Sequence, residues 1–198
     1  MTNGARPPLT IAVEGDTDVA VVRRVVAAAG REVAYEYPTG GKGRLDRQLS
    51  GYNSAARFSP WLVIRDLNGD ADCAPAYIAA NLPEPSEKMR FRICVRSIES
   101  WLLADRANLA AYLVVSAAHI PPNPETLANP KVAMVSTAAK SRSRLIREDM
   151  VPQPGISSAV GPGYVARLIE FAGMRWDPVS AAANSDSLAR CLRSLGTL

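Results

Sequence analysis

One stretch of twelve residues limits the choice of fold more than any other part of the chain. It reads Trp61-Leu-Val-Ile-Arg-Asp-Leu-Asn-Gly-Asp-Ala-Asp72, an apolar run that leads directly into several carboxylates. A short apolar run bounded by turn residues is typical of a strand buried on both faces of a parallel sheet. Asp66 would end this strand, and Asn68, Asp70 and Asp72 would lie in the loop beyond it. Open α/β sheets bind ligands at this end of their strands, so the stretch predicts a ligand site.

Three further apolar segments predict strands of the same sheet, at residues 9–14, 33–37 and 92–96. Helical patterns follow the predicted strands, and strands that alternate with helices indicate βαβ units and a parallel sheet. From residue 106 onward the β signal ends, and short helices separated by Pro and Gly are expected. We therefore predict an α/β core at residues 1–105, with a four-stranded parallel sheet and flanking helices, and a helical extension at residues 106–198 packed on it.

Composition narrows the class of protein. The 198 residues are 47% hydrophobic, which suits an ordinary globular core. No apolar run is long enough to cross a membrane and the start lacks the apolar core of a signal peptide, so a cytoplasmic protein without a membrane segment is expected. The three cysteines are odd in number and form no CxxC, which argues against a disulfide framework or a zinc site. His119, the only histidine, lies in a predicted linker and is expected to have no catalytic role.

Positive charge is concentrated in the last third of the chain. Residues 1–130 hold 14 Lys/Arg and 14 Asp/Glu, whereas residues 131–198 hold nine against five. The densest basic run is Ala139-Lys-Ser-Arg-Ser-Arg-Leu-Ile-Arg147. On a helix Arg144 and Arg147 would face the same way as Lys140, which predicts a phosphate-binding strip, although a solvated helix face is the alternative. Lys42, in the Gly-rich loop after the second strand, is a further candidate for nucleic-acid binding.

Carboxylates end three of the predicted strands. Glu14 follows the first strand, Asp66 and Asp70 follow the third, and Glu99 lies in the first helical turn after the fourth. Each of them alone is explained by a helix cap or a turn. Together they crowd negative charge at one edge of the sheet, and Mg²⁺ (or Mn²⁺), which prefers oxygen ligands, would relieve their repulsion. A divalent-metal site is therefore the expectation.

The order of these motifs resembles the Toprim domain, which topoisomerases, bacterial primases, small RNA-maturation nucleases and the overcoming-lysogenization-defect nucleases share. The resemblance covers residues 9 to about 105 and is carried by Val13-Glu-Gly-Asp-Thr-Asp18, a glycine-bearing loop at residues 40–43 and Arg65-Asp-Leu-Asn-Gly-Asp70. Glu99 resembles the extra acidic residue of the overcoming-lysogenization-defect branch. The stretch from Arg92 to Asp105, with Gly161-Pro-Gly-Tyr164 downstream, is similar to an uncharacterised bacterial family of stand-alone Toprim-like proteins.

The resemblance implies a Toprim/Rossmann-like fold and an acidic site. Its catalytic residues would be Glu14, Asp66 and Asp70. Its metal ligands would be Glu14, Asp18, Asp66, Asn68, Asp70 and Glu99. The sequence departs from the family at Asn68, where the second aspartate of the family's DxD is expected. Asp66 with Asp70 is our preferred acidic pair, and Asp70 with Asp72 is the alternative.

The activity implied is Mg²⁺-dependent cleavage of phosphodiester bonds in DNA or RNA, in antiphage defence. The partners implied are nucleic acid, an ATPase encoded nearby and a second copy of the chain in a homo-oligomer. The alternative is a non-catalytic Toprim-like subunit that binds a partner protein or nucleic acid. A phosphoacceptor aspartate, as in response-regulator receivers, ranks last because no lysine on a fifth strand is identifiable. Trp101, Leu102 and Leu103 are expected in the core.

Overall fold

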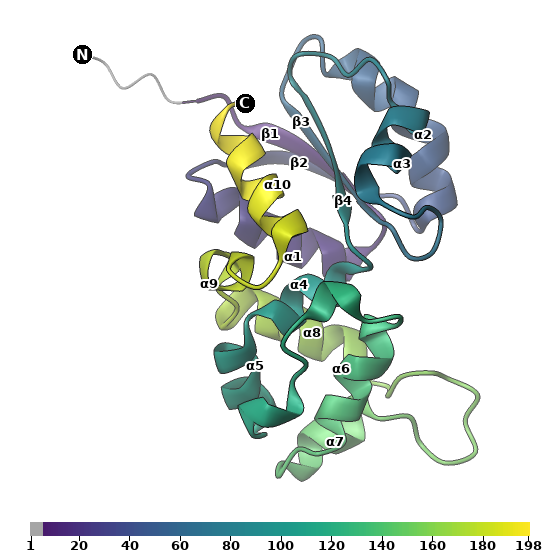
Figure 1. Ribbon diagram of the computed structural model, residues 1–198, viewed down its shortest axis with the longest axis vertical. Coiled ribbons are helices and arrows are strands. Elements are labelled where there is room, and N and C mark those ends of the chain that lie inside the picture. Colours follow the sequence, from purple (N-terminus) through teal and green to yellow (C-terminus); the bar gives the residue numbers. More distant parts are fainter. Residues whose placement is uncertain (1–5) are drawn as a thin grey trace.

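The computed structural model describes residues 6–198 and places a parallel sheet above a group of helices (Figure 1). The strands are β1 (Leu9–Val13), β2 (Val33–Pro38), β3 (Trp61–Asp66) and β4 (Met89–Cys94). All pair in parallel, in the order β2-β1-β3-β4. The predicted four-stranded α/β fold is confirmed. In the register of β3 with β4, Asp66 lies opposite Cys94, so the two strands end level with each other.

Hydrophobic patterning explains where the strands lie. All five residues of β1 and the first five of β3 are buried, as expected for central strands with both faces covered. β4 begins at Met89, three residues before the start predicted at Arg92. Its first half alternates buried Met89 and Phe91 with half-buried Arg90 and Arg92, which is the period of a strand at the edge of a sheet. The arginines interrupt the apolar run, and for this reason the start was predicted too late.

Helices cover both faces of the sheet, which makes the fold three-layered (Figure 1). α2 (Lys42–Ala55) and α3 (Ala74–Asn81) pack on one face, over the side chains of Val63 and Phe91. α1 (Asp16–Ala28) and α10 (Asp186–Gly196) pack on the other face, over Ile11 and Leu62. α10, the last helix of the chain, therefore returns to the sheet and contacts α1 and β4.

α4 (Ile98–Ala104) follows β4 and belongs to the predicted core. The remaining helices form the C-terminal region that the sequence predicts. They are α5 (Arg106–Leu113), η1 (Ala117–His119), η2 (Pro124–Thr126), α6 (Pro130–Ala138), α7 (Arg144–Met150), α8 (Tyr164–Met174) and α9 (Pro178–Ala182). α8 packs on α1, and one hydrophobic cluster continues from β1 through α4 into α8 and α10. Trp101, Leu102 and Leu103 are completely buried in this cluster, which confirms their expected place in the core.

The structure also places the histidine and the cysteines. His119 is exposed at the end of η1. The cysteines are free thiols: Cys94 and Cys191 are buried, and Cys73 is exposed at the start of α3. Among residues 6–198, no helix combines the length and the apolar character needed to cross a membrane.

Candidate active site

The topology brings Glu14 and Asp66 together. The chain turns to opposite sides after β1 and β3, which are neighbours in the sheet, and a crevice opens at the carboxyl ends of two such strands. Glu14 directly follows β1 and Asp66 ends β3. The main-chain N–H of Asp66 donates a 3.0 Å hydrogen bond to Oε1 of Glu14. The two residues expected from the sequence to form the site are therefore adjacent.

Glu99 joins them from the next strand. α4 begins at Ile98 with Ser97 as its N-terminal cap, so Glu99 lies in the first turn of the helix that follows β4. Its buried carboxylate accepts hydrogen bonds from the Ser97 hydroxyl at 2.7 Å and from the Tyr164 hydroxyl at 3.2 Å. Nζ of Lys131 lies 3.7 Å from the same carboxylate. Two hydroxyl groups thus hold the Glu99 carboxylate in place, and a cation faces it.

A cavity of about 590 Å³ opens over these carboxylates. Glu14, Asp66 and Glu99 line it together with two cations, Arg96 and Lys131. The other lining residues are Asn68, Gly69, Ser97, Ala128, Asn129 and Pro130. Both negative and positive side chains therefore meet in one space at the carboxyl edge of the sheet, as a site for a phosphate and a metal ion requires.

Burial and mutual repulsion act on the carboxyl groups of this site. Burial, followed by the charges of Asp18, Glu14 and Glu99, holds the pKa of Asp66 well above its usual range. Burial also raises the pKa of Asp18 to about 7, against an opposing hydrogen bond from the Gly15 N–H, and the nearby Glu14 and Glu99 add to the rise. The pKa of Glu14 is likewise raised by burial. The site therefore favours either a bound proton or a bound cation.

Asp18 contributes charge rather than an open ligand. One of its carboxylate oxygens accepts a 2.9 Å hydrogen bond from the N–H of Gly15, which closes the turn between β1 and α1. The side chain is 9% exposed and does not line the cavity. The predicted metal ligand Asp18 therefore lies outside the cavity, but close enough for its charge to act on Asp66.

Asn68 and Gly69 line the cavity together with Asp66. Asn68 adopts a left-handed conformation with φ of 50°, which asparagine tolerates better than most residues. Its N–H donates to the carbonyl of Arg96 at 2.7 Å, and Arg96 donates to the carbonyl of Asn68 at 3.0 Å. The loop after β3 is in this way paired with the segment after β4, and Asn68 lies where the sequence places a metal ligand.

Asp70, the predicted partner of Asp66, points elsewhere. Its carboxylate pairs with Nζ of Lys42 at 3.0 Å and with the guanidinium of Arg65 at 2.6 Å, and it does not line the cavity. The Lys42 ammonium, and after it the Arg65 guanidinium, lower the pKa of Asp70. Asp72 lines a different cavity. The structure therefore brings neither proposed pair, Asp66 with Asp70 nor Asp70 with Asp72, into one site, and Lys42 is engaged by Asp70.

Arg65 explains why the loop takes this course. Its side chain is 3% exposed and lies over the ring of Tyr77, 4.4 Å from the ring centroid. It pairs with Asp46 at 3.1 Å as well as with Asp70, and it donates to the carbonyl of Asp66 at 2.6 Å. A buried guanidinium requires paired charges. Asp70 supplies one of them, and so it is drawn away from Glu14 and Asp66.

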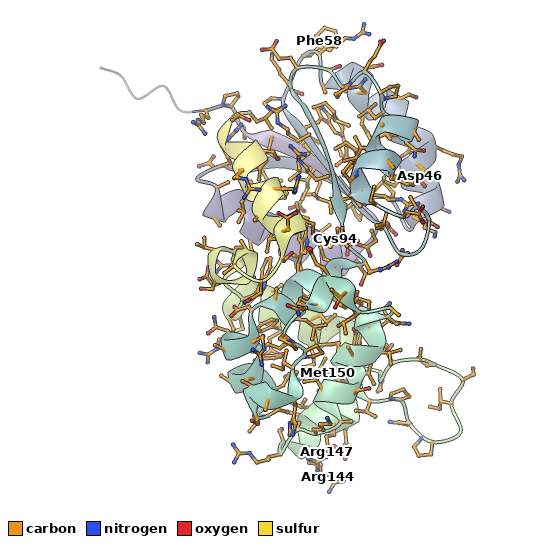
Figure 2. All side chains as sticks on the ribbon, in the orientation of Figure 1. Asp46, Phe58, Cys94, Arg144, Arg147 and Met150 are labelled. Atoms are coloured by element: carbon orange, nitrogen blue, oxygen red, sulfur yellow. The ribbon has the colours of Figure 1, made fainter. Side chains whose placement is uncertain are left out.

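The basic run lies far from the carboxylates. Arg144 and Arg147 are on α7 at one end of the molecule, whereas Cys94 marks the end of β4 near its middle (Figure 2). Arg144 pairs with Glu148 at 2.7 Å, and Arg147 donates to the carbonyl of Ser141. Lys140 precedes α7 and is outside that helix, so the expected common helical face does not form.

Arg96 and Lys131 are cations of the cavity that the sequence analysis did not name as binding residues. Arg96 lies two residues beyond the end of β4, so its position near the strand end is a signal that was available. The Val95–Arg96 peptide bond is cis. Lys131 lies at the start of α6, more than sixty residues beyond Asp66, and only tertiary packing brings it to the cavity. No local pattern in the sequence indicates that contact.

The donor set suits a hard cation that keeps part of its water shell. Among residues 6–198 no three His, Cys, Asp or Glu side chains form a group that could by itself hold a metal ion. Mg²⁺ is commonly held by one or two carboxylates together with water and substrate phosphate. Glu14 and Asp66 can supply the carboxylates. Comparisons of the chain with protein-family models, curated proteins and solved structures give no match.

Proposed function

We propose that the chain is a divalent-metal-dependent nuclease with a Toprim-like acidic site. One observation carries the proposal. Glu14, Asp66 and Glu99, from the ends of three neighbouring strands, line the same cavity as Arg96 and Lys131. Cleavage of a phosphodiester needs anionic groups for a metal and cationic groups for the phosphate, and this cavity holds both.

Glu14 and Asp66 are the residues that would hold Mg²⁺ or Mn²⁺, with Asn68 beside them. Burial raises the pKa values of both groups, and neighbouring carboxylates raise that of Asp66 further. A cation there would favour their ionised forms. When bound, such an ion polarises the phosphate and lowers the pKa of water for in-line attack. Few carboxylates are needed, because water and phosphate oxygens complete the shell of Mg²⁺.

Arg96 and Lys131 are the groups that would orient the phosphate. Lys131 is positioned by Glu99, whose carboxylate is held in turn by Ser97 and Tyr164. A guanidinium and an ammonium that line the same cavity as the carboxylates can hold a phosphate next to a metal ion. The partner ATPase and the role in antiphage defence follow from the Toprim resemblance and are part of the same proposal.

The second candidate is a Toprim-like subunit that binds nucleic acid or a partner protein without cleaving. Two observations favour it. Asn68 stands where the family has its second acid, and the nearest substitute, Asp70, is paired with Lys42 and Arg65. A site with fewer charges holds a metal more weakly. In that case the cavity would bind a phosphate and leave the bond intact.

A nuclease assay separates the two candidates. Plasmid, single-stranded DNA and RNA are incubated with the protein in Mg²⁺, in Mn²⁺ and in EDTA, with and without the product of the neighbouring gene. We expect metal-dependent cleavage that Asp66→Asn abolishes. Asp70→Asn is the matched control, because it removes an aspartate of the same loop outside the cavity, and it should retain cleavage. Binding without cleavage under every condition would favour the second candidate.

A further inference from the structure

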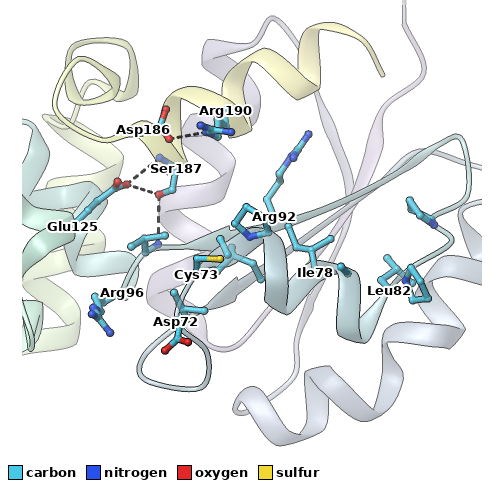
Figure 3. A pocket seen from close by; sticks show the side chains of 18 residues that line it. Asp72, Cys73, Ile78, Leu82, Arg92, Arg96, Glu125, Asp186, Ser187 and Arg190 are labelled. Carbon is cyan, nitrogen blue, oxygen red and sulfur yellow. Dashed lines mark hydrogen bonds and ion pairs between the residues drawn. The ribbon is translucent and has the colours of Figure 1, made fainter.

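A second and larger cavity lies beside the acidic site. Its volume is about 760 Å³, within the range of pockets that hold small molecules. It runs between α3 and α10 along the end of β4 (Figure 3). Its walls are mainly aliphatic. They are formed by Leu67, Ile78, Leu82, Ile93 and Val95, with Pro75, Pro83 and Pro85. We call this cavity the β4 groove.

Charged side chains also line the β4 groove. They are the carboxylates of Asp72, Glu125 and Asp186 and the guanidinium groups of Arg92, Arg96 and Arg190. Glu125 accepts a 3.0 Å hydrogen bond from the Ser187 N–H and a 2.6 Å bond from the Ser185 hydroxyl, and Asp186 pairs with Arg190 at 2.6 Å. Carboxylates at the rim of an apolar slot are suited to accept from the N–H groups of a flat heterocycle.

Arg96 connects the β4 groove with the acidic site. Of the residues that the structure describes, it is the one that lines both cavities, and Figure 3 shows it beside the loop that carries Asp72. One of its terminal nitrogens donates to the carbonyl of Asn68. Its Nε is buried and, within residues 6–198, has no hydrogen-bond partner. The side chain as a whole is half-buried, so a terminal nitrogen can donate to a phosphate oxygen at the boundary between the cavities.

We propose that the β4 groove holds the unpaired nucleoside next to the phosphate that is cleaved. The inference rests on the proposed nuclease function and adds the class of substrate: single-stranded nucleic acid, or a strand from which one base is turned out. One side of a phosphate held by Arg96 would face Glu14 and Asp66, where a metal ion would bind. The nucleoside attached to that phosphate would then extend toward the groove. The aliphatic walls take the base between them, and the rim carboxylates accept from its N–H groups.

The β4 groove lies between α3 and α10 and would take one nucleoside. A stacked duplex presents only the edges of its bases, so it cannot place a nucleoside there. Enzymes that act beside a single base therefore take it out of the stack or use single strands. A substrate that has an unpaired base at the cleavage position is the one that can place a phosphate at Arg96 and a nucleoside in the groove.

Cys73 provides a test in the unmodified protein. It lines the groove and is exposed, whereas the other two thiols, Cys94 and Cys191, are buried. Its rate of reaction with a chromogenic disulfide reagent is measured with and without a five-nucleotide oligonucleotide, once as DNA and once as RNA, in EDTA. Binding should slow the reaction in proportion to the fraction bound. A blunt-ended duplex that contains the same sequence should give no protection.

Two alanines of α3 provide a matched pair of variants. Ala79 lines the groove and Ala80, its neighbour on the same helix, does not, and both are exposed. Ala79→Trp should fill the groove and weaken oligonucleotide binding on the order of tenfold, as expected for the loss of one base contact. Ala80→Trp should bind as the wild type does. The Cys73 measurement decides the question even when the tryptophan disturbs folding.

The outcomes separate this inference from the nuclease proposal. Protection of Cys73 together with weaker binding by Ala79→Trp supports the groove, even when no substrate is cleaved. No binding by the wild type, or binding that leaves Cys73 unprotected, overturns it, and would direct the search toward a peptide as the occupant. Metal-dependent cleavage with equal binding by Ala79→Trp and Ala80→Trp also overturns the groove and leaves the nuclease proposal in place.

Discussion

The main chain of Asp66 is tied to the side chain of Glu14: the Asp66 N–H donates a 3.0 Å hydrogen bond to Oε1 of Glu14. The ends of β3 and β1 are therefore coupled through an acidic side chain of the site itself. This bond lowers the pKa of Glu14, but burial outweighs it and the pKa is raised. Glu14 thus has a structural role as well as its proposed role toward a cation, so its variants must keep the acceptor oxygen.

Mg²⁺ should stabilise the wild type and leave Asp66→Asn almost unchanged. At a free Mg²⁺ concentration about ten times Kd, binding adds about 1.4 kcal/mol to the free energy of unfolding. For a chain of this size that corresponds to a rise in Tm of about 3–6 °C. Removal of one carboxylate also relieves repulsion, so Asp66→Asn without metal should be at least as stable as the wild type. Thermal unfolding in EDTA and in MgCl₂ measures both effects.

Two controls accompany this measurement. Glu14→Gln keeps an oxygen that can accept from the Asp66 N–H and should also lose the Mg²⁺ effect. Asp70→Asn should retain the Mg²⁺ effect and lose about 1 kcal/mol or less, because its partner Lys42 is exposed and Arg65 keeps Asp46. If Mg²⁺ shifts the Tm of none of the four proteins, or if Asp66→Asn unfolds the chain, Asp66 is a structural turn residue and the metal proposal fails.

The buried carboxyl of Asp18 should make stability depend on pH. Its pKa is about 7 in the folded protein, against 3.8 as its ordinary value, so the folded state binds the extra proton. Stability therefore falls as pH rises from about 4 to about 7. Asp18→Asn mimics the protonated form. Its free energy of unfolding, relative to that of the wild type, should rise by about 3 kcal/mol from pH 5 to pH 8, at about 1.4 kcal/mol per pKa unit. Urea unfolding in EDTA at several pH values measures this difference.

Asp16→Asn is the matched control for the effect of pH. Asp16 lies in the same first turn of α1 but is exposed, so its replacement should give no comparable gain with rising pH. Mg²⁺ should reduce the gain of Asp18→Asn at pH 8, because a cation at Glu14 and Asp66 also favours the ionised form of Asp18. A difference between Asp18→Asn and the wild type that stays constant from pH 5 to pH 8 would contradict the prediction.

The sheet, and the carboxylates that follow its strands, were predictable for a physical reason. β1 and β3 are continuous apolar runs because both of their faces are covered, and the residue after such a run must lie at the sheet edge. The position of Glu14, Asp66 and Glu99 after predicted strands therefore sufficed to predict that they lie together, and all three line one cavity. Parallel pairing supplies the convergence, and no long-range information was needed.

The side-chain directions in the loop after β3 were not predictable in the same way. Asp66 and Asp70 are only four residues apart, yet one lines the cavity and the other pairs with Arg65 and Lys42. The choice depends on a guanidinium that is buried over Tyr77, which lies on α3. Lys131 likewise reaches the cavity through the packing of α6 on α4. Contacts between distant elements decide both cases, and local patterns do not encode them.

Arg65→Lys should destabilise the protein although the charge is kept. Lysine replaces a planar guanidinium that contacts Asp46, Asp70 and the ring of Tyr77 at once, and its ammonium cannot make all three contacts. Charges left without full pairing at a buried position cost about 2–4 kcal/mol. Urea unfolding at pH 7 gives the value. Arg47→Lys, at an exposed position of α2, is the control and should stay within about 0.5 kcal/mol of the wild type.

The salt dependence of oligonucleotide binding should identify the cations that hold phosphate. Lys131→Gln removes a cation that lines the acidic cavity, whereas Arg144→Gln removes one that pairs with Glu148 on distant α7. Each phosphate contact that is lost should lower the slope of log K against log salt by about 0.7 for a single strand. Binding titrations in EDTA at four salt concentrations should show this loss for Lys131→Gln and a slope like that of the wild type for Arg144→Gln, with Lys140→Gln and Arg147→Gln measured alongside. The opposite pattern would mean that the basic run at residues 140–147, and not the cavity, binds the nucleic acid.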